Sequence, residues 1–422
     1  MSSCRRTPLG RRATTLRRIL GCMGVLVGAH SASAAPISEA ELVRRYLASP
    51  VARVSMSAMD DRVRAERRAS PLFGNPELDV RHEEARGVAG ATTDAVGLSF
   101  GVDLGLSNVS AWQAARLSGE AAQLMRSAQL LERVCELRRQ GIDLHAATAA
   151  TEVTVTSQGR LKEMVGTLEA LAEAGEASGY DRDRAALALF SHHADVIAVE
   201  GKRIALQVGL SAKLGEPVDA VVLAPLAQLP ARETVISRVA SHPEVLGLRV
   251  ALDASRKGEA AARRGGLPDV RLAGARRWDA PPGGTATPGF EVGGAVELPL
   301  FEHAQSEVRK AAATRADADA VLLRREGERV AAVQGAWQRA ASLEDAPTAV
   351  DPEGIWTAAT ARYVAGEASV EGLLQVAEAV ESAQTAGIER DRLLRRAHLD
   401  VACGTGHFAE LEIQSAIEEA LR

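Results

Sequence analysis

Hydrophobic and polar residues alternate without interruption over residues 96–106, Val-Gly-Leu-Ser-Phe-Gly-Val-Asp-Leu-Gly-Leu. A period of two predicts a β-strand with one apolar face and one face of polar or small residues. Half-buried strands of soluble sheets share this pattern with strands that cross a bilayer at a tilt, for which about 9–11 residues suffice. The stretch by itself leaves both interpretations open.

The same alternation occurs again over residues 290–300, Phe-Glu-Val-Gly-Gly-Ala-Val-Glu-Leu-Pro-Leu. Three pairs of segments align in the same order: 75–80 with 267–272, 102–106 with 296–300, and 175–178 with 366–369. Their offsets of 192, 194 and 191 residues are nearly constant. Such regular spacing indicates a duplicated unit of about 190 residues.

Each unit is predicted to contain a β-hairpin, at 77–106 and at 269–300, followed by a long helical hairpin. Leu117, Ala121, Leu124, Ala128, Leu131 and Cys135 follow the spacing of a coiled-coil seam. Helical pattern extends from about Ser107 to Ala174, which would measure about 100 Å if unbroken. The returning helices end near Leu214 and Leu399.

The predicted order along the chain is a leader at 1–34, a first repeat at 35–215, a linker at 216–231, a second repeat at 232–403 and a tail at 404–422. The leader has six arginines, an apolar run at 19–27 and Ala-Ser-Ala before Ala35. This order is typical of a secretory signal peptide. The first repeat is expected to begin with one helix over residues 38–70.

Composition and charge narrow the function classes. The leader contains no acidic residue, so the remaining chain carries a net charge of −11. An acidic exported chain is a poor candidate for nucleic-acid binding. No motif suits acid–base, nucleophilic or phosphate chemistry, and no histidine spacing suits a metal, so we expect neither an enzyme nor a cofactor. Cys135 and Cys403 lie in helical patterns and are expected to be buried thiols, in preference to a disulfide or a metal ligand.

Four strands cannot close a barrel, and an open sheet edge in lipid leaves backbone groups without hydrogen bonds. If these strands cross a membrane, at least two copies are needed to reach eight strands. The long helices would then project from the shared barrel.

The order of motifs resembles the TolC-like outer-membrane efflux family across residues 36–403. The resemblance rests on Asn75-Pro-Glu-Leu78, Arg263-Arg-Gly-Gly-Leu-Pro-Asp269, Val296-Glu-Leu-Pro-Leu-Phe301 and the turn Gly175-Glu-Ala-Ser-Gly-Tyr-Asp181. It implies a mainly α chain with transmembrane β-strands. Three copies would form a homotrimer with a 12-stranded barrel in outer-membrane lipid, continued into an α-helical barrel in the periplasm.

The resemblance also implies the outer-membrane channel of a tripartite efflux system. Such a channel passively conducts substrates from an inner-membrane pump and a periplasmic adaptor protein to the exterior, and it is gated at the periplasmic tip. The alternative is a soluble periplasmic coiled-coil protein of the adaptor type. Adaptors carry one helical hairpin beside a domain rich in short strands, whereas this sequence shows two hairpins and no such domain.

The resemblance assigns roles to individual residues. Tyr363 and Asp181 occupy gate positions, Arg184 or Arg362 would replace a gate arginine that falls at Ala368, and an acidic constriction position falls at Gly372. The turn residues Gly175, Ser178, Gly366 and Ser369 would dock the adaptor. Lipid-facing strand residues would be Val96, Leu98, Phe100, Val102, Leu104, Phe290, Val292, Val296 and Leu298. As alternatives, Asp181 and Arg184 could form a solvated ion pair on one helix, and Tyr363 could be coiled-coil packing.

Overall fold

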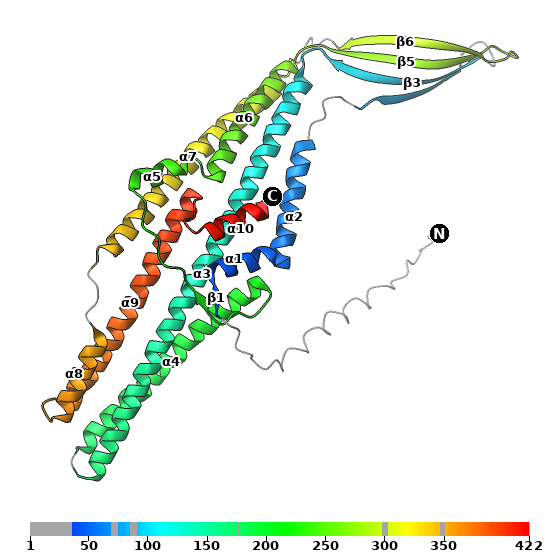
Figure 1. The fold of residues 1–422 in the computed structure, drawn as a ribbon. Coiled ribbons are helices and arrows are strands. Elements are labelled where there is room, and N and C mark those ends of the chain that lie inside the picture. Colours follow the sequence, from blue (N-terminus) through cyan, green and yellow to red (C-terminus); the bar gives the residue numbers. More distant parts are fainter. Residues whose placement is uncertain are drawn as a thin grey trace, which may run out of the picture.

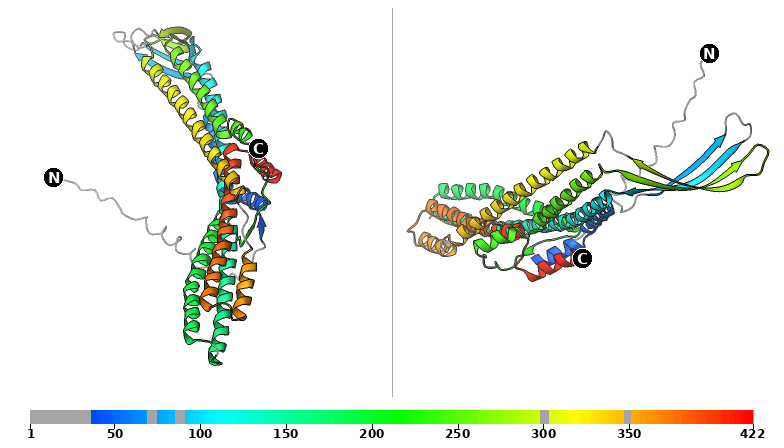
Figure 2. Two further views of the ribbon diagram at one scale, coloured as in Figure 1. Left: turned by 90° about the vertical axis from the view of Figure 1, so that its left-hand side faces the viewer. Right: turned by 90° about the horizontal axis from the view of Figure 1, so that it is seen from above.

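The structure, a computed structural model, describes residues 36–68, 75–84, 91–175, 177–297, 303–346 and 351–421. The expected signal peptide lies outside these residues. The described chain is elongated, with a β-sheet at one end and two helical hairpins at the other (Figure 1). Two further views show the same separation of sheet and helices (Figure 2).

Four strands form one antiparallel sheet in the order β2-β3-β5-β6: β2 (Glu77–Glu84), β3 (Thr92–Asp103), β5 (Asp269–Ala280) and β6 (Thr287–Glu297). β2 and β3 come from the first repeat, and β5 and β6 from the second. The two hairpins join through the β3–β5 pair, in which Val96 lies opposite Arg276 and Asp103 opposite Asp269. A second, two-stranded sheet pairs β1 (Ile37–Ser38) with β4 (Val221–Val222) in parallel.

Helix α3 (Ser107–Glu173) runs unbroken for 67 residues from the sheet to the far tip. Two of its glycines permit close packing instead of interrupting the helix. A Cβ at Gly119 would collide with the side chain of Arg67, and one at Gly141 would lie 3.1 Å from Leu42. The chain returns along α3 as α4 (Gly179–Leu214).

The second repeat has α5 (Arg232–Val239), α6 (Pro243–Arg264), α7 (Gln305–Glu344), α8 (Pro352–Val364) and α9 (Val370–Thr405). α6 packs along α3, and α7 lies against α6 and α9. The outgoing arm consists of two helices, α7 and α8, and Pro352 is the first residue of α8. The tail forms α10 (Leu411–Leu421), which packs against α1.

The single helix expected over residues 38–70 is instead two helices, α1 (Glu39–Ala48) and α2 (Pro50–Arg68). Ser49 between them is extended, with φ −67° and ψ 151°. Proline disfavours helical backbone in the residue that precedes it, so Pro50 ends α1 and opens α2. Ser38 caps α1, because its Oγ accepts a hydrogen bond from the Glu41 amide at 3.2 Å.

The largest apolar core lies midway along the molecule. It brings together side chains from α1, α3, α4, α9 and α10, including the fully buried Leu42, Leu137 and Leu210. Among the described residues no helix is both long and apolar enough to span a bilayer.

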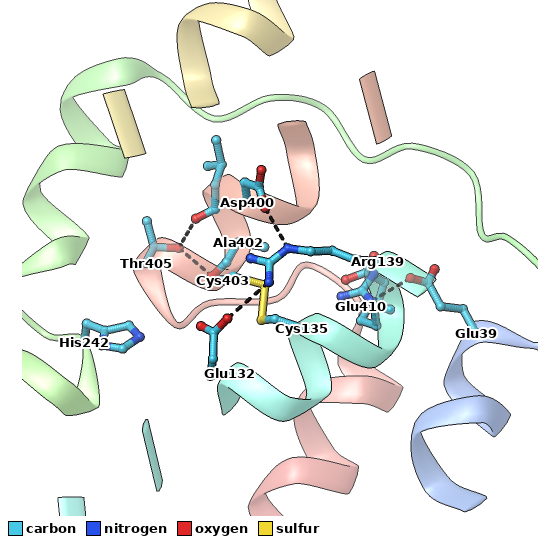
Figure 3. The surroundings of a disulfide bond; sticks show 12 residues. Glu39, Glu132, Cys135, Arg139, His242, Asp400, Ala402, Cys403, Thr405 and Glu410 are labelled. Atoms are coloured by element: carbon cyan, nitrogen blue, oxygen red, sulfur yellow. Dashed lines mark hydrogen bonds and ion pairs between the residues drawn. A yellow bond between two sulfur atoms is a disulfide. The ribbon is translucent and has the colours of Figure 1, made fainter. Parts of the chain in front are cut away.

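The prediction of free thiols is wrong, because Cys135 of α3 and Cys403 of α9 form a disulfide in this core (Figure 3). The bond links the two repeats across 268 residues of sequence, with the Cα atoms 6.1 Å apart. Each cysteine lies in a helical pattern that carries no sign of the other. Only the packing of α9 on α3 brings them together.

Candidate functional site: a two-faced sheet and a helical tip

One face of the four-stranded sheet is apolar and uncovered. On β3, Val96 and Leu98 are 44% and 55% exposed, and on β6, Phe290 and Val292 are 85% and 88% exposed. Cross-strand neighbours extend this face over all four strands, with Leu78 opposite Leu98, Val80 opposite Val96, Leu272 opposite Phe100 and Val270 opposite both Val102 and Val296. No part of the described chain buries it, and a contiguous apolar patch of this kind marks a protein or membrane interaction surface.

The predicted lipid-facing residues share this face. Val96, Leu98, Phe100, Val102, Phe290, Val292 and Val296 are all exposed on it, and Leu104 follows just after β3 at 61% exposure. Leu298 lies outside the described residues.

The opposite face carries small and charged side chains. Arg271 of β5 reaches across β3 to Glu77 of β2, with 3.8 Å between Nη1 and Oε2. The intervening β3 positions, Ser99 and Gly101, are small enough to permit this contact. β3 and β5 approach each other so closely at residue 97 that it must be glycine, since a Cβ there would lie 2.8 Å from the Cβ of Ala275. The sheet is therefore apolar on one side and polar on the other.

Both edges of the sheet are open. Within the described residues, β2 pairs only with β3, and β6 pairs only with β5. Each outer edge therefore presents backbone N–H and C=O groups with no strand beside it, which is costly in lipid and hazardous in water.

The two tip turns have the same construction. Gly175 and Gly366 adopt left-handed φ values of 77° and 76°, which glycine accepts without strain. Three residues later, Ser178 and Ser369 cap α4 and α9: the Ser178 Oγ accepts from the Tyr180 amide and the Ser369 Oγ from the Gly372 amide, both at 3.2 Å. The two turns predicted to dock the adaptor therefore share a left-handed glycine and a serine helix cap.

The predicted gate residues lie where the two helical hairpins meet. Arg184 of α4 pairs with Glu371 of α9, with 3.2 Å between Nη2 and Oε1. Burial and the negative charge of Asp181 both raise the pKa of Tyr363. Arg362 instead approaches Glu367 within its own turn, at 3.7 Å. The structure therefore brings Asp181, Arg184 and Tyr363 to the junction but leaves Arg362 outside it.

An apolar cluster closes the same junction. Leu161 and Leu168 of α3 pack with Val370 and Leu373 of α9, and Tyr363 lies against this cluster. Packing against this cluster therefore contributes to the position of Tyr363. Arg184 forms its ion pair with Glu371 on another helix.

Sequence reasoning missed the acidic partners between the hairpins. Glu371 forms an ion pair with Arg184. Glu353 of α8 pairs with Arg160 of α3 at 2.6 Å. Glu381 of α9 lies 2.8 Å from the ring of His192. No spacing signal could have identified them, because each partner lies nearly 190 residues or more from its mate. Among the described residues, no group of three or more His, Cys, Asp or Glu side chains could hold a metal ion.

No protein-family sequence model and no curated protein sequence matches the chain. Solved structures do match. The outer membrane protein VceC from Vibrio cholerae is 17% identical with TM-score 0.73, covering 88% of this chain and 97% of that chain. The Campylobacter jejuni CmeC outer membrane channel is 15% identical with TM-score 0.70, covering 100% and 98%.

The open state of the Neisseria gonorrhoeae MtrE outer membrane channel is also similar, at 18% identity and TM-score 0.70, covering 87% of this chain and 89% of that chain. These channels belong to the TolC family, so the resemblance seen in the sequence is confirmed as a shared fold. The fold of this chain is the one seen in these channel proteins.

Proposed function

We propose that this chain is the outer-membrane channel of a tripartite efflux system. It would passively conduct substrates from an inner-membrane pump and a periplasmic adaptor to the exterior. The observation that carries this proposal is the uncovered apolar face that continues across all four strands of the sheet. In outer-membrane lipid this face meets hydrocarbon, and the polar face lines a water-filled passage.

The open edges of β2 and β6 favour a homotrimer. When the β6 edge of one copy pairs with the β2 edge of the next, every backbone group is hydrogen-bonded and no edge remains in lipid. Three copies of a four-stranded sheet make 12 strands, an even number in the range of single-chain bacterial barrels. The helices continue the passage into the periplasm.

Exposed apolar residues along α4 support the same assembly. Leu187, Phe190, Ile197 and Val208 are 69%, 78%, 62% and 62% exposed and recur at helical spacing. Within the described residues α4 packs mainly on α3 and barely touches α9. Neighbouring copies would bury this stripe, and with it Val364 at the end of α8, which is also 81% exposed.

The tip would serve as gate and docking site. The paired turns at Gly175, Ser178, Gly366 and Ser369 would present a repeated surface to the adaptor. Asp181, Arg184 and Tyr363 would hold the passage closed, with Arg362 stabilising the second turn. The soluble adaptor-type alternative is not favoured, because an adaptor in water would have to cover the apolar face of the sheet.

The test is heat-modifiable electrophoresis of the detergent-extracted outer membrane, followed by planar-bilayer conductance. We expect a trimer-sized band that converts to monomer on boiling, and ion-conducting events from the unboiled trimer. Recovery of a monomer in the periplasmic wash, with no conductance, would contradict the proposal.

A further inference from the structure

Arg276 differs from the other arginines of the described sheet. Three of them pair with a carboxylate: Arg81 with Asp79 at 3.4 Å, Arg271 with Glu77 at 3.8 Å and Arg277 with Asp279 at 2.8 Å. Those three lie on the polar face. Arg276 lies on the apolar face, between the register partners Val96 and Phe290, and has no carboxylate partner among the described residues.

Arg276 also marks the end of the apolar surface. Its guanidinium lies over the ring of Trp278, 5.4 Å from the centroid, toward the hairpin end of β5. On β3 the next residue of this face beyond Val96 is Asp94, whose carboxylate is already hydrogen-bonded to the His82 ring at 2.5 Å. On β2 and β3 the face therefore changes from apolar to polar at this level, far from the helices.

A lone arginine on such a face fits one kind of anion. Charged side chains are strongly disfavoured at the middle of a bilayer but tolerated near its surface, where tryptophan also collects. A guanidinium presents paired N–H donors that match the oxygens of a phosphate. The unpaired charge, its aromatic support and its level at the boundary together indicate a lipid phosphate.

We propose that Arg276 binds the phosphate of lipid A in the outer leaflet, with Trp278 holding the guanidinium in place. The inference rests on the proposed function, because the hairpin ends of the sheet reach the outer leaflet only if the helices lie in the periplasm. A trimer would carry three such sites around the barrel rim.

The experiment titrates the detergent-purified trimer with diphosphoryl lipid A and counts bound lipid by native mass spectrometry. We expect Arg276→Gln to weaken binding at least fivefold and Arg276→Lys to weaken it less, because lysine keeps the charge but loses the paired donors. Arg277→Gln is the matched control: it is adjacent in sequence, lies on the opposite face, and should bind lipid A as the wild type does.

Equal binding by the Arg276 and Arg277 variants would overturn the proposal. So would equal binding of phosphatidylcholine, or displacement of lipid A by millimolar inorganic phosphate. If Arg276→Gln does not fold, Arg276→Lys against Arg277→Lys decides the question by the same count. A wild-type trimer that conducts but binds no lipid A refutes only this inference, whereas a monomer without conductance refutes the proposed function.

Discussion

His242 is a buried residue whose structural role depends on its being uncharged. It is 2% exposed, and its Nδ1 accepts a hydrogen bond from the Glu244 amide at 3.1 Å, which caps α6. Arg329 lies beside the same ring, 3.2 Å from Nε2. Burial, followed by the charge of Arg329, lowers the pKa of His242 from 6.5 to about 4. Protonation would remove the cap and place two cations side by side.

Stability should therefore fall as the medium is acidified. Above pH 6.5 the residue is neutral in both states, while between pH 6.5 and about 4 the unfolded chain binds a proton that the folded chain does not. The loss amounts to at most about 3 kcal/mol. Asparagine is a good N-cap and does not titrate, so His242→Asn should reduce the drop in Tm between pH 7.5 and pH 4.5. His407→Asn, at an exposed position, is the control and should leave the drop unchanged.

Arg138 joins three parts of the chain at the core. Its side chain is 5% exposed and donates from Nε to Glu39 at 2.6 Å and from Nη2 to Glu410 at 2.8 Å, with the guanidinium over the Phe408 ring. These contacts connect the first residue of α1, the middle of α3 and the segment before α10.

Substituting Arg138 alone should destabilise the fold strongly. Arg138→Leu leaves the buried Glu39 carboxylate without its counter-charge, which costs about 3–5 kcal/mol, and should lower the Tm of the purified protein clearly. Replacing all three charged residues by leucine should cost much less, because no buried charge then remains. A triple variant less stable than Arg138→Leu would show that the charges themselves stabilise the fold.

At the scale of elements, the contacts between the two repeats change character along their length. The disulfide between Cys135 and Cys403 joins α3 to α9 near the core, and Arg139 bonds Asp400 beside it (Figure 3). Toward the tip the contacts between the repeats are non-covalent, and the last of those described is the ion pair of Arg184 with Glu371. The two repeats are therefore joined by a covalent bond at the core and only by non-covalent contacts toward the tip.

Loss of the disulfide should destabilise the fold without changing its topology. A bridge over a long loop contributes about 2–4 kcal/mol, so Cys135→Ala should lower the Tm, as should treatment of the wild type with a reductant. Cys403→Ala and the double variant should lower it by the same amount, because either change removes the whole bond. Additive losses would show that the two sulfurs act separately.

At the scale of the whole molecule, the ion pair of Arg184 with Glu371 links the hairpins where the passage would close. A solvent-exposed ion pair is weakened by water and salt and contributes little by itself, but a trimer would contain three. Arg184→Glu should therefore favour the open tip and raise single-channel conductance in planar bilayers. The charge swap, Arg184→Glu with Glu371→Arg, should restore the lower conductance.

Arg182 provides the control for this experiment. It pairs with the adjacent Asp183 on α4 and not with the second hairpin, so Arg182→Glu should leave conductance unchanged. An equal effect of both variants would mean that net charge at the tip, and not the link between hairpins, controls conductance.

The sequence by itself determined the elements and their duplication. Alternation over 96–106 predicts β3 and over 290–300 predicts β6, because side chains of a strand point to opposite faces in turn. The glycine and serine of each tip turn are equally local signals, since a left-handed backbone and a helix cap depend on single residues. These patterns also predicted the fold that the solved channels share.

Tertiary structure alone decided which distant residues meet. The Cys135–Cys403 bond, the acidic partner of Arg184 and the register that leaves Arg276 on the apolar face all depend on how the second repeat packs on the first. Such contacts produce no periodic pattern in the sequence, because each partner follows only the pattern of its own helix or strand. The break between α1 and α2 at Ser49 has a local signal in the sequence, because Pro50 follows it. The pairings between repeats have no such signal, since they form only when α9 packs on α3 and β5 lies beside β3.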